Sequence, residues 1–194
     1  RRSSDLADIR IDGAGKKVTR SDNCRVSDLS VSSDNLTFTY EAKSLPYPID
    51  TSYYDNEKHT QADALSVIPF MDEMNYEGLS VSGLSDGYYG LTIGGEFIGR
   101  FTARELERGI NMALLQNTPQ YKQAMKIRQM NEERWLKERK MREFYWVEYN
   151  LMRKTGMLWA CNEAAVDTLR KYRPHDIFLQ WNGDLWLQYK IGRA

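Results

Sequence analysis

The repeat of apolar residues changes once along this chain, close to residue 101, and this change limits the possible folds. Before it, apolar and polar residues alternate in short runs, and Leu36, Phe38 and Tyr40 share one face of a strand. A period of two is typical of strands with one solvent-exposed face. The later residues have helical spacing. The sequence predicts an α+β protein, with a small antiparallel β-sheet or sandwich in residues 1–101 and a long helical hairpin in residues 102–194, packed together as one domain.

Turn residues divide the first part into short strands. Pro46 and Pro48 stop any strand there, because proline cannot donate a ladder hydrogen bond, and residues 49–63 are predicted to form a long polar loop. Gly94 and Gly95 are typical of a two-residue hairpin turn, since glycine adopts positive φ. The predicted strands cover residues 9–11, 16–20, 26–31, 36–40, 65–70, 78–81, 88–93 and 96–101.

A capping box opens the helical part. The Thr102 hydroxyl and the Glu105 carboxylate satisfy each other's backbone donors, which predicts a helix from Thr102 to about Leu115. Gly109 inside that helix costs about 1 kcal/mol relative to alanine, so we expect close backbone packing around it. Asn111 needs hydrogen-bond partners if it is buried. We expect Asn111 to tie the helix to the sheet, with a substrate-facing role as the alternative.

A second helix begins at Thr118 and Pro119, which suit the N-cap and the first helical position. No helix breaker follows until Gly156, so the helix has about 36 residues and a length of roughly 54 Å. Such a rod is longer than a small domain, so part of it packs on another body, and dimerisation through it is left open. Two shorter helices are predicted over residues 162–172 and 176–190.

Charge and hydropathy exclude two classes of partner. Lys and Arg number 27 against 27 Asp and Glu, so the formal net charge is zero. The excess of basic residues after residue 118 is interleaved with acids at i,i+4, as in Glu133–Lys137, which favours a solvated helix face over the alternative, a nucleic-acid binder. No apolar run approaches the roughly 20 residues of a membrane span, and no signal-peptide stretch follows the first residues. We expect no nucleic-acid partner and no membrane span.

No catalytic, cofactor or metal site is predicted. Residues 83–87, GLSDG, match the G-x-S-x-G nucleophile motif, but a strand follows where that motif needs a helix, so a tight hairpin turn is predicted around Ser85. His59 and His175 have no third group to complete a triad or a metal site. Cys24 and Cys161 are interpreted as buried structural thiols, with a disulfide between them as the alternative.

Aromatic residues provide the remaining candidate binding residues. Tyr53 and Tyr54 lie in a polar loop with little core to fill, so sugar stacking or contact with another domain is the interpretation there. Trp181 and Trp186, like the aromatic residues of 144–149, have helical spacing and favour a core or a domain interface. Together with Asn111, these four residues are the candidate substrate or domain contacts.

Several motifs, in a consistent order, resemble a known family. They are NCRVS (23–27), LTFTY (36–40), LPYPID (45–50), GLSDGYYGLTIGG (83–95), GINMA (109–113) and TP (118–119). This order is similar to the region after the catalytic domain in bacterial SGNH (GDSL-like) lipases and acylhydrolases. The resemblance covers the chain up to about residue 149.

The resemblance implies a function without a catalytic residue in this chain. In that family a serine in a G-D-S block and a D-x-x-H block perform catalysis, and neither block occurs here. The chain would then be the non-catalytic C-terminal portion of an esterase acting on lipid or acetylated carbohydrate. It would shape or cover the active site of an N-terminal domain of the same polypeptide, in a periplasmic or secreted protein. A carbohydrate- or protein-binding accessory module is the alternative.

Overall fold

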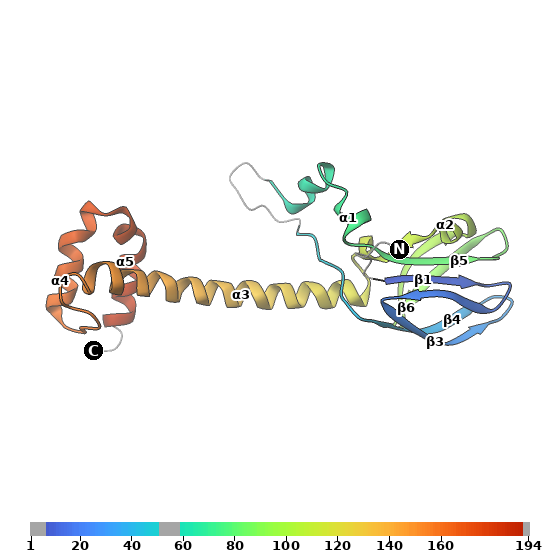
Figure 1. Ribbon diagram of the computed structural model, residues 1–194, viewed down its shortest axis with the longest axis horizontal. Helices are drawn as coiled ribbons and strands as arrows, with labels where there is room; N and C mark the ends of the chain where they lie inside the picture. The colour runs from blue at the N-terminus through green and yellow to red at the C-terminus, as the bar shows by residue number, and fades with distance from the viewer. Residues whose placement is uncertain (1–6, 51–58, 192–194) are drawn as a thin grey trace. The chain divides into compact units, whose positions relative to one another are not determined.

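The computed structural model describes residues 7–50 and 59–191, which form an α+β protein as predicted (Figure 1). The chain divides into two compact units, Arg1–Arg128 and Gln129–Ala194, called here the β unit and the helical unit. The long helix begins in the first and ends in the second. The packing of the two sequence-defined parts as one domain stays a prediction.

The central sheet of the β unit has four strands in the order β2-β1-β5-β8. β1 (Ala7–Asp12) pairs in parallel with β5 (Glu77–Ser82), while β2 (Lys17–Asp22) and β8 (Ile110–Asn111) pair antiparallel at the two edges. β1 and β5 are parallel and far apart in sequence, so no hairpin turn connects them and no turn residues in the sequence predict their pairing. The core of this unit lies on the sheet and is formed by Ala7, Ile9, Ile11, Cys24, Leu79, Val81, Leu106 and Met112.

Two hairpins complete the β unit, and both are confirmed predictions. β3 (Cys24–Val31) pairs with β4 (Leu36–Ala42), and β6 (Tyr88–Ile93) pairs with β7 (Glu96–Thr102). Gly94 and Gly95, in the second turn, have φ values of 59° and 84°. Glycine adopts such values without steric cost, and they match the twist of the two strands.

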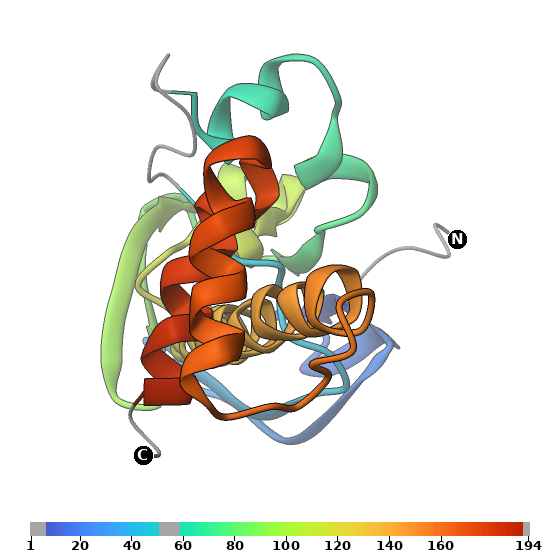
Figure 2. The same cartoon turned by 90° about the vertical axis from the view of Figure 1, so that its left-hand side faces the viewer.

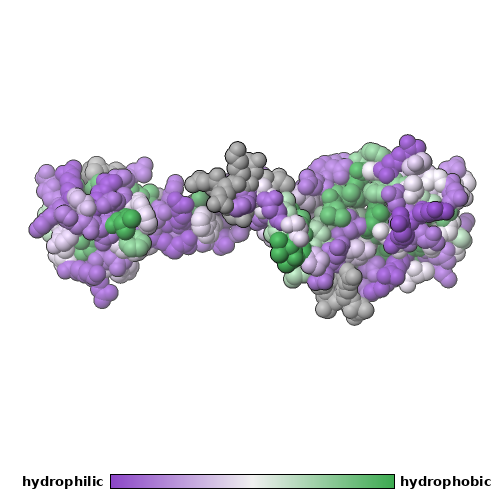
Figure 3. Space-filling view, turned by 90° about the horizontal axis from the view of Figure 1, so that it is seen from above, coloured by the Kyte–Doolittle hydropathy of each residue, from purple (hydrophilic) through white to green (hydrophobic). Residues whose placement is uncertain are grey.

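The predicted strand over residues 65–70 is wrong. The segment forms a 3₁₀ turn, η1 (Gln61–Ser66), and a short helix, α1 (Phe70–Glu73). Asp63 accepts a hydrogen bond from the backbone N–H of Thr60 at 2.6 Å, which is a capping interaction that starts a helical turn. Val67 is 81% exposed, so its side chain is not part of a core face. Figure 3 shows hydrophobic residues, in green, gathered in several patches among hydrophilic ones on this face.

The helix predicted from Thr102 to Leu115 is shorter than expected. Its start is confirmed, since Glu105 Oε2 accepts the Thr102 N–H at 2.7 Å and Thr102 Oγ1 accepts the Glu105 N–H at 3.2 Å. However, α2 (Ala103–Arg108) ends at Gly109, whose φ is 94°. A glycine with positive φ terminates a helix, so this residue is a stop rather than an interior position. The chain then forms β8 and a 3₁₀ turn, η2 (Met112–Leu114).

The predicted long helix is confirmed. α3 (Pro119–Val147) continues into a π-helical turn, η3 (Glu148–Met152), and the chain turns away at Gly156, where φ is 74°. None of the helices in the described ranges, 7–50 and 59–191, is long and apolar enough to cross a membrane.

The helical unit packs the end of α3 and the π turn against two further helices. α4 (Glu163–Tyr172) and α5 (Ile177–Ile191) lie side by side, with η4 (Arg173–His175) between them (Figures 1 and 2). Both helices were predicted, and Asn162 Oδ1 caps the first by accepting the Ala165 N–H at 3.0 Å. The core of this unit consists of Val147, Leu151, Met152, Ala165, Leu169, Leu179 and Trp186.

Candidate functional site

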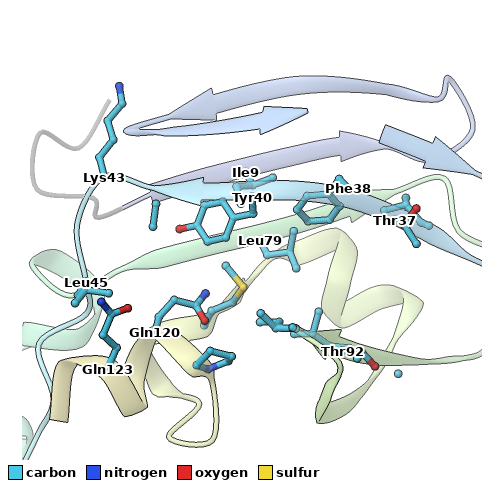
Figure 4. Close-up of a pocket in the computed structure, with 18 of the residues that line it drawn as sticks. Ile9, Thr37, Phe38, Tyr40, Lys43, Leu45, Leu79, Thr92, Gln120 and Gln123 are labelled. Carbon is cyan, nitrogen blue, oxygen red and sulfur yellow. The ribbon is translucent and has the colours of Figure 1, made fainter. Parts of the chain in front are cut away.

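A cleft of about 960 Å³ lies in the β unit, between the two hairpins and the first turns of α3. Ile9 and Leu79 of the central sheet line it, together with Phe38 from β4 and Thr92 from β6 (Figure 4). The alternation along β4 has a direct consequence, because it packs one set of side chains on the core and leaves the hydroxyl of Thr37 exposed. Lys43 and the two glutamines of the first helical turn add further polar groups.

A buried glutamate binds two of the side chains that line the cleft. Tyr40 Oη donates a hydrogen bond to Glu77 Oε1 at 2.7 Å, and Gln120 Nε2 donates to the same oxygen at 3.3 Å. Glu77 is 1% exposed. Its backbone N–H donates to Asn111 Oδ1 at 3.0 Å, which fixes the start of β5. Strand β4, strand β5 and helix α3 therefore meet at one carboxyl group.

Burial shifts the pKa of the Glu77 carboxyl group. Desolvation raises the pKa of Glu77, and the hydrogen bonds from Tyr40 and Gln120 oppose that rise without cancelling it. Burial and the neighbouring carboxylate also raise the pKa of Tyr40. Among the described residues, two buried oxygens, Glu77 Oε2 and Gln120 Oε1, have no hydrogen-bond partner. A buried carboxylate oxygen without a donor favours the protonated form of the carboxyl group.

The raised pKa of Glu77 predicts that the β unit loses stability as pH rises. The folded state holds this proton more tightly than the unfolded state, so the stabilisation is complete below the usual glutamate pKa of 4.5 and is lost as pH rises through the raised pKa. Glu77→Gln keeps the shape and supplies an amide N–H, so this variant should lose that part of the pH dependence. Hydrogen exchange of the β1 and β5 amides between pH 4 and 8 measures the difference.

Glu105→Gln is the matched control. Backbone and side-chain hydrogen bonds from Thr102 lower the pKa of Glu105, so its stabilisation is present above the usual pKa and is lost as pH falls. The two variants should therefore change the pH dependence with opposite signs. Parallel pH profiles for wild type and Glu77→Gln would contradict a protonated Glu77.

Asn111 lies in β8 rather than in a helix, and all four of its hydrogen-bonding positions are used. Its Nδ2 donates to the carbonyls of Met71, at 2.9 Å, and Asn75, at 3.1 Å. Its Oδ1 accepts the backbone N–H groups of Glu77 and Ala113, each at 3.0 Å. The side chain thus ties α1 and the start of β5, which follow one another in sequence, to the distant segment that holds β8 and η2. Contact of Asn111 with substrate or another domain stays a prediction.

Two of the four aromatic residues predicted as contacts, Trp181 and Trp186, lie in the described residues, and one is exposed whereas the other is buried. Trp181 lies on α5 and is 66% exposed, with its ring edge-on to Phe178 at 5.6 Å. Trp186 is fully buried in the helical unit, and its Nε1 donates to Glu148 Oε1 at 2.8 Å. Tyr53 and Tyr54 lie outside the described residues.

The structure also shows the surroundings of the serine and the cysteines for which the sequence predicts no catalytic role. Ser85 lies in a turn between β5 and β6, and its carbonyl accepts a hydrogen bond from Tyr89 Oη at 2.8 Å. The predicted hairpin is wrong, because β5 pairs with β1 and β8 whereas β6 pairs with β7. Cys24 is buried and Cys161 is exposed, and both are free thiols. Within residues 7–50 and 59–191, no group of three or more His, Cys, Asp and Glu side chains could hold a metal ion.

Sequence reasoning missed Glu77, and a signal for it was available. Glu77 is two residues before Leu79 and four before Val81, so it shares their face of β5, which points to the core. A carboxyl on a core face needs partners or a proton. Its partners Tyr40 and Gln120 lie 37 and 43 residues away. No spacing in the sequence brings those three residues together.

Two comparisons relate the chain to known proteins. Residues 125–193 match a family model described as the diltiazem deacetylase C-terminal helical domain. Among solved structures, the chain is similar to BT4096, a gut microbial diltiazem-metabolizing enzyme, with a TM-score of 0.86 and 34% sequence identity. The similarity covers 96% of this chain and 42% of that enzyme, so the chain spans less than half of its length. No curated protein matches the chain.

The resemblance to SGNH (GDSL-like) acylhydrolases is wrong as an identification. The family match and the structural match both give a diltiazem deacetylase or diltiazem-metabolizing enzyme instead. The two motifs with glycines owe them to backbone geometry, as at the Gly94–Gly95 turn and at the helix end at Gly109. Such positions report backbone geometry, which unrelated proteins share.

Proposed function

We propose that this chain is the C-terminal, accessory part of a deacetylase, an enzyme that removes an acetyl group by hydrolysis. The catalytic residues would lie in a preceding part of the same polypeptide. The observation that carries this proposal is the match to the diltiazem-metabolizing enzyme, which extends over 96% of this chain but 42% of the enzyme. The match of residues 125–193 to a domain described as C-terminal supports the same placement.

The nucleophiles in the described residues support an accessory role. Ser85 lies on a turn between strands, without the helix N-terminus that an oxyanion site uses. Burial raises the pKa of the Cys24 thiol, and the carboxylates of Asp22 and Asp8 raise it further. A raised pKa disfavours the thiolate, which is the nucleophilic form. Neither residue has the surroundings of an activated nucleophile.

The cleft of the β unit supports a role at the active site of the catalytic part. Its volume of about 960 Å³ lies within the usual range of small-molecule sites, about 300–1,000 Å³. Its floor is apolar, and polar groups, Lys43 and two glutamines among them, lie around it, as expected of a surface that contacts an acylated substrate. We assign to it the shaping or covering of the neighbouring active site.

The hydrolysis of p-nitrophenyl acetate tests the proposal. The 194-residue chain alone should release no nitrophenolate above the buffer rate, whereas the natural gene product should release it. The intact mass of that product, measured first, should exceed the mass of this chain. A natural product that begins at Arg1, or hydrolysis by the isolated chain, would overturn the proposal.

A carbohydrate-binding accessory module is the second candidate function. The cleft favours it, because Asn35, Gln120 and Gln123 line it beside Phe38, and amide groups are suitable partners for sugar hydroxyls. Retention of the chain on immobilised acetylated polysaccharide is expected in that case. Gln123→Arg, which places a large side chain at the cleft, should abolish retention, and Thr39→Arg, at a position that does not line the cleft, should not.

A further inference from the structure

A second pocket, of about 380 Å³, lies within the helical unit. Tyr145 of α3, Trp159 of the loop after Gly156 and Tyr189 of α5 line it with aromatic rings. Its volume falls in the range of small-molecule sites, about 300–1,000 Å³. The helical spacing of the aromatic residues in 144–149 predicted a core or a domain interface for them, and Trp159 was not among the predicted binding residues.

The rings at this pocket are ordered against one another but left half open to solvent. The Trp159 ring lies edge-on to Tyr145, with centroids 5.8 Å apart and an angle of 87°, and edge-on to Tyr149 at 5.7 Å and 85°. The two tyrosine rings stack at 6.2 Å. Exposed fractions are 42% for Tyr145, 48% for Tyr149 and 46% for Trp159. Large aromatic side chains with this much free surface are typical of binding sites.

Trp159 is held in a strained conformation. Its φ is 64°, in the left-handed region that a bulky side chain rarely adopts. The backbone N–H of Trp159 donates to Glu148 Oε2 at 2.8 Å. Glu148 is itself fully buried and accepts Trp186 Nε1 and Lys190 Nζ at its other oxygen. A rigid network thus imposes the strain, and the strain fixes where the indole of Trp159 stands.

Folding stability does not account for this arrangement. A bulky residue in the left-handed region would be offset by burying its ring in a core, yet nearly half of the Trp159 side chain is exposed. Strain of this kind, held by the surrounding structure, is characteristic of functional sites. The strained backbone thus holds the Trp159 side chain with nearly half of its surface open to solvent.

The charged side chains at the pocket determine which net charge of a ligand is favoured. Lys140 and Lys190 line it, and among its described lining residues none is acidic. Lys190 is paired with Glu148 at 2.7 Å, and its side chain is 7% exposed, whereas Lys140 is exposed. A cation would meet this ammonium group without a compensating carboxylate. The pocket therefore suits a neutral or anionic ligand.

We propose that this pocket binds the flat, apolar ring of a small molecule, neutral or anionic, which packs against Trp159 and Tyr145. The site lies wholly within the helical unit, so the proposal stands independently of the proposed deacetylase function. An aromatic ring in offset-stacked or edge-to-face contact with these side chains gains both buried area and the ring–ring interaction.

Calorimetric titration of the full 194-residue chain with three naphthalene probes tests this site. 2-Naphthol and 2-naphthoate should each bind saturably at one site per chain, and 2-naphthylmethylammonium should bind at least about tenfold more weakly than 2-naphthoate. Trp159→Gly is the main variant, since glycine adopts the same φ without strain. It should weaken naphthoate binding by about tenfold or more, because a ring–ring contact and its buried area are lost.

Two further variants keep the test decisive. Trp181→Ala removes an exposed tryptophan that does not line the pocket and should leave naphthoate binding unchanged within about twofold. Tyr145→Leu keeps an apolar side chain on α3 and should weaken binding as Trp159→Gly does. Each of three results would overturn the proposal: no saturable binding of either uncharged or anionic probe, equal binding of the cationic probe, or unchanged binding in both pocket variants.

Discussion

Replacing Glu148 by leucine is expected to destabilise the helical unit by about 3–5 kcal/mol, the cost of removing one partner of a buried ion pair. Glu148 is fully buried in the π-helical turn. Its carboxylate accepts hydrogen bonds from Lys190 Nζ, Trp186 Nε1 and the Trp159 N–H, at 2.7, 2.8 and 2.8 Å. Leucine would leave a buried ammonium and two buried N–H donors without these partners, while filling a similar volume.

Tryptophan fluorescence during urea unfolding measures this effect directly, because all five tryptophans lie after residue 128. Glu138→Leu is the control: the Glu138 side chain is 43% exposed and pairs with Arg134 at 3.0 Å, so its loss should cost no more than about 1 kcal/mol. Adding Lys190→Met to Glu148→Leu removes the stranded charge and should recover much of the lost stability. Equal effects of the Glu148 and Glu138 variants would show that the buried network is not what holds this unit.

Asn111→Asp is expected to destabilise the β unit by about 2–5 kcal/mol. The carboxylate oxygen that replaces Nδ2 would face the carbonyl oxygens of Met71 and Asn75, both of which now accept hydrogen bonds from Asn111. Each buried acceptor left without a donor costs about 1–3 kcal/mol. Repulsion between the carboxylate and the two carbonyls adds to that cost.

Far-UV circular dichroism and hydrogen exchange of the β5 amides follow this unit, which has no tryptophan. Asn117→Asp is the control, because Asn117 Nδ2 also donates to a carbonyl, that of Ile98 at 2.8 Å, but the asparagine itself is exposed. It should cost less than about 1 kcal/mol, since water replaces the lost donor. If Asn111→Asp folds as stably as Asn117→Asp, then Asn111 is not the structural tie described here.

Much of the fold could be predicted where local chemistry decides it. The capping box at Thr102, the glycine turn at residues 94–95 and the break at Gly156 each satisfy backbone requirements within a few residues. The same local logic failed at residues 65–70, where an apolar run was taken as a strand although Val67 is 81% exposed. It failed again at Gly109, which ends a helix instead of packing inside one.

The candidate sites depend on contacts that no local pattern encodes. Glu148 and Trp186 meet across 38 residues, and Glu77 and Gln120 across 43. Trp159 receives its conformation from Glu148, 11 residues before it. Each of these contacts depends on how the helices and strands pack. The spacing of residues predicted the helices, but it did not predict which side chains would be in contact.

Hydrolysis of p-nitrophenyl acetate by the natural gene product, with and without the segment equivalent to residues 1–194, is the measurement on which the proposed accessory role depends. The complete polypeptide should release nitrophenolate, the 194-residue chain alone should release none above the buffer rate, and removing this segment should lower kcat/KM although the catalytic residues remain. Full activity after removal of the segment, or ester hydrolysis by the chain alone, would contradict that role.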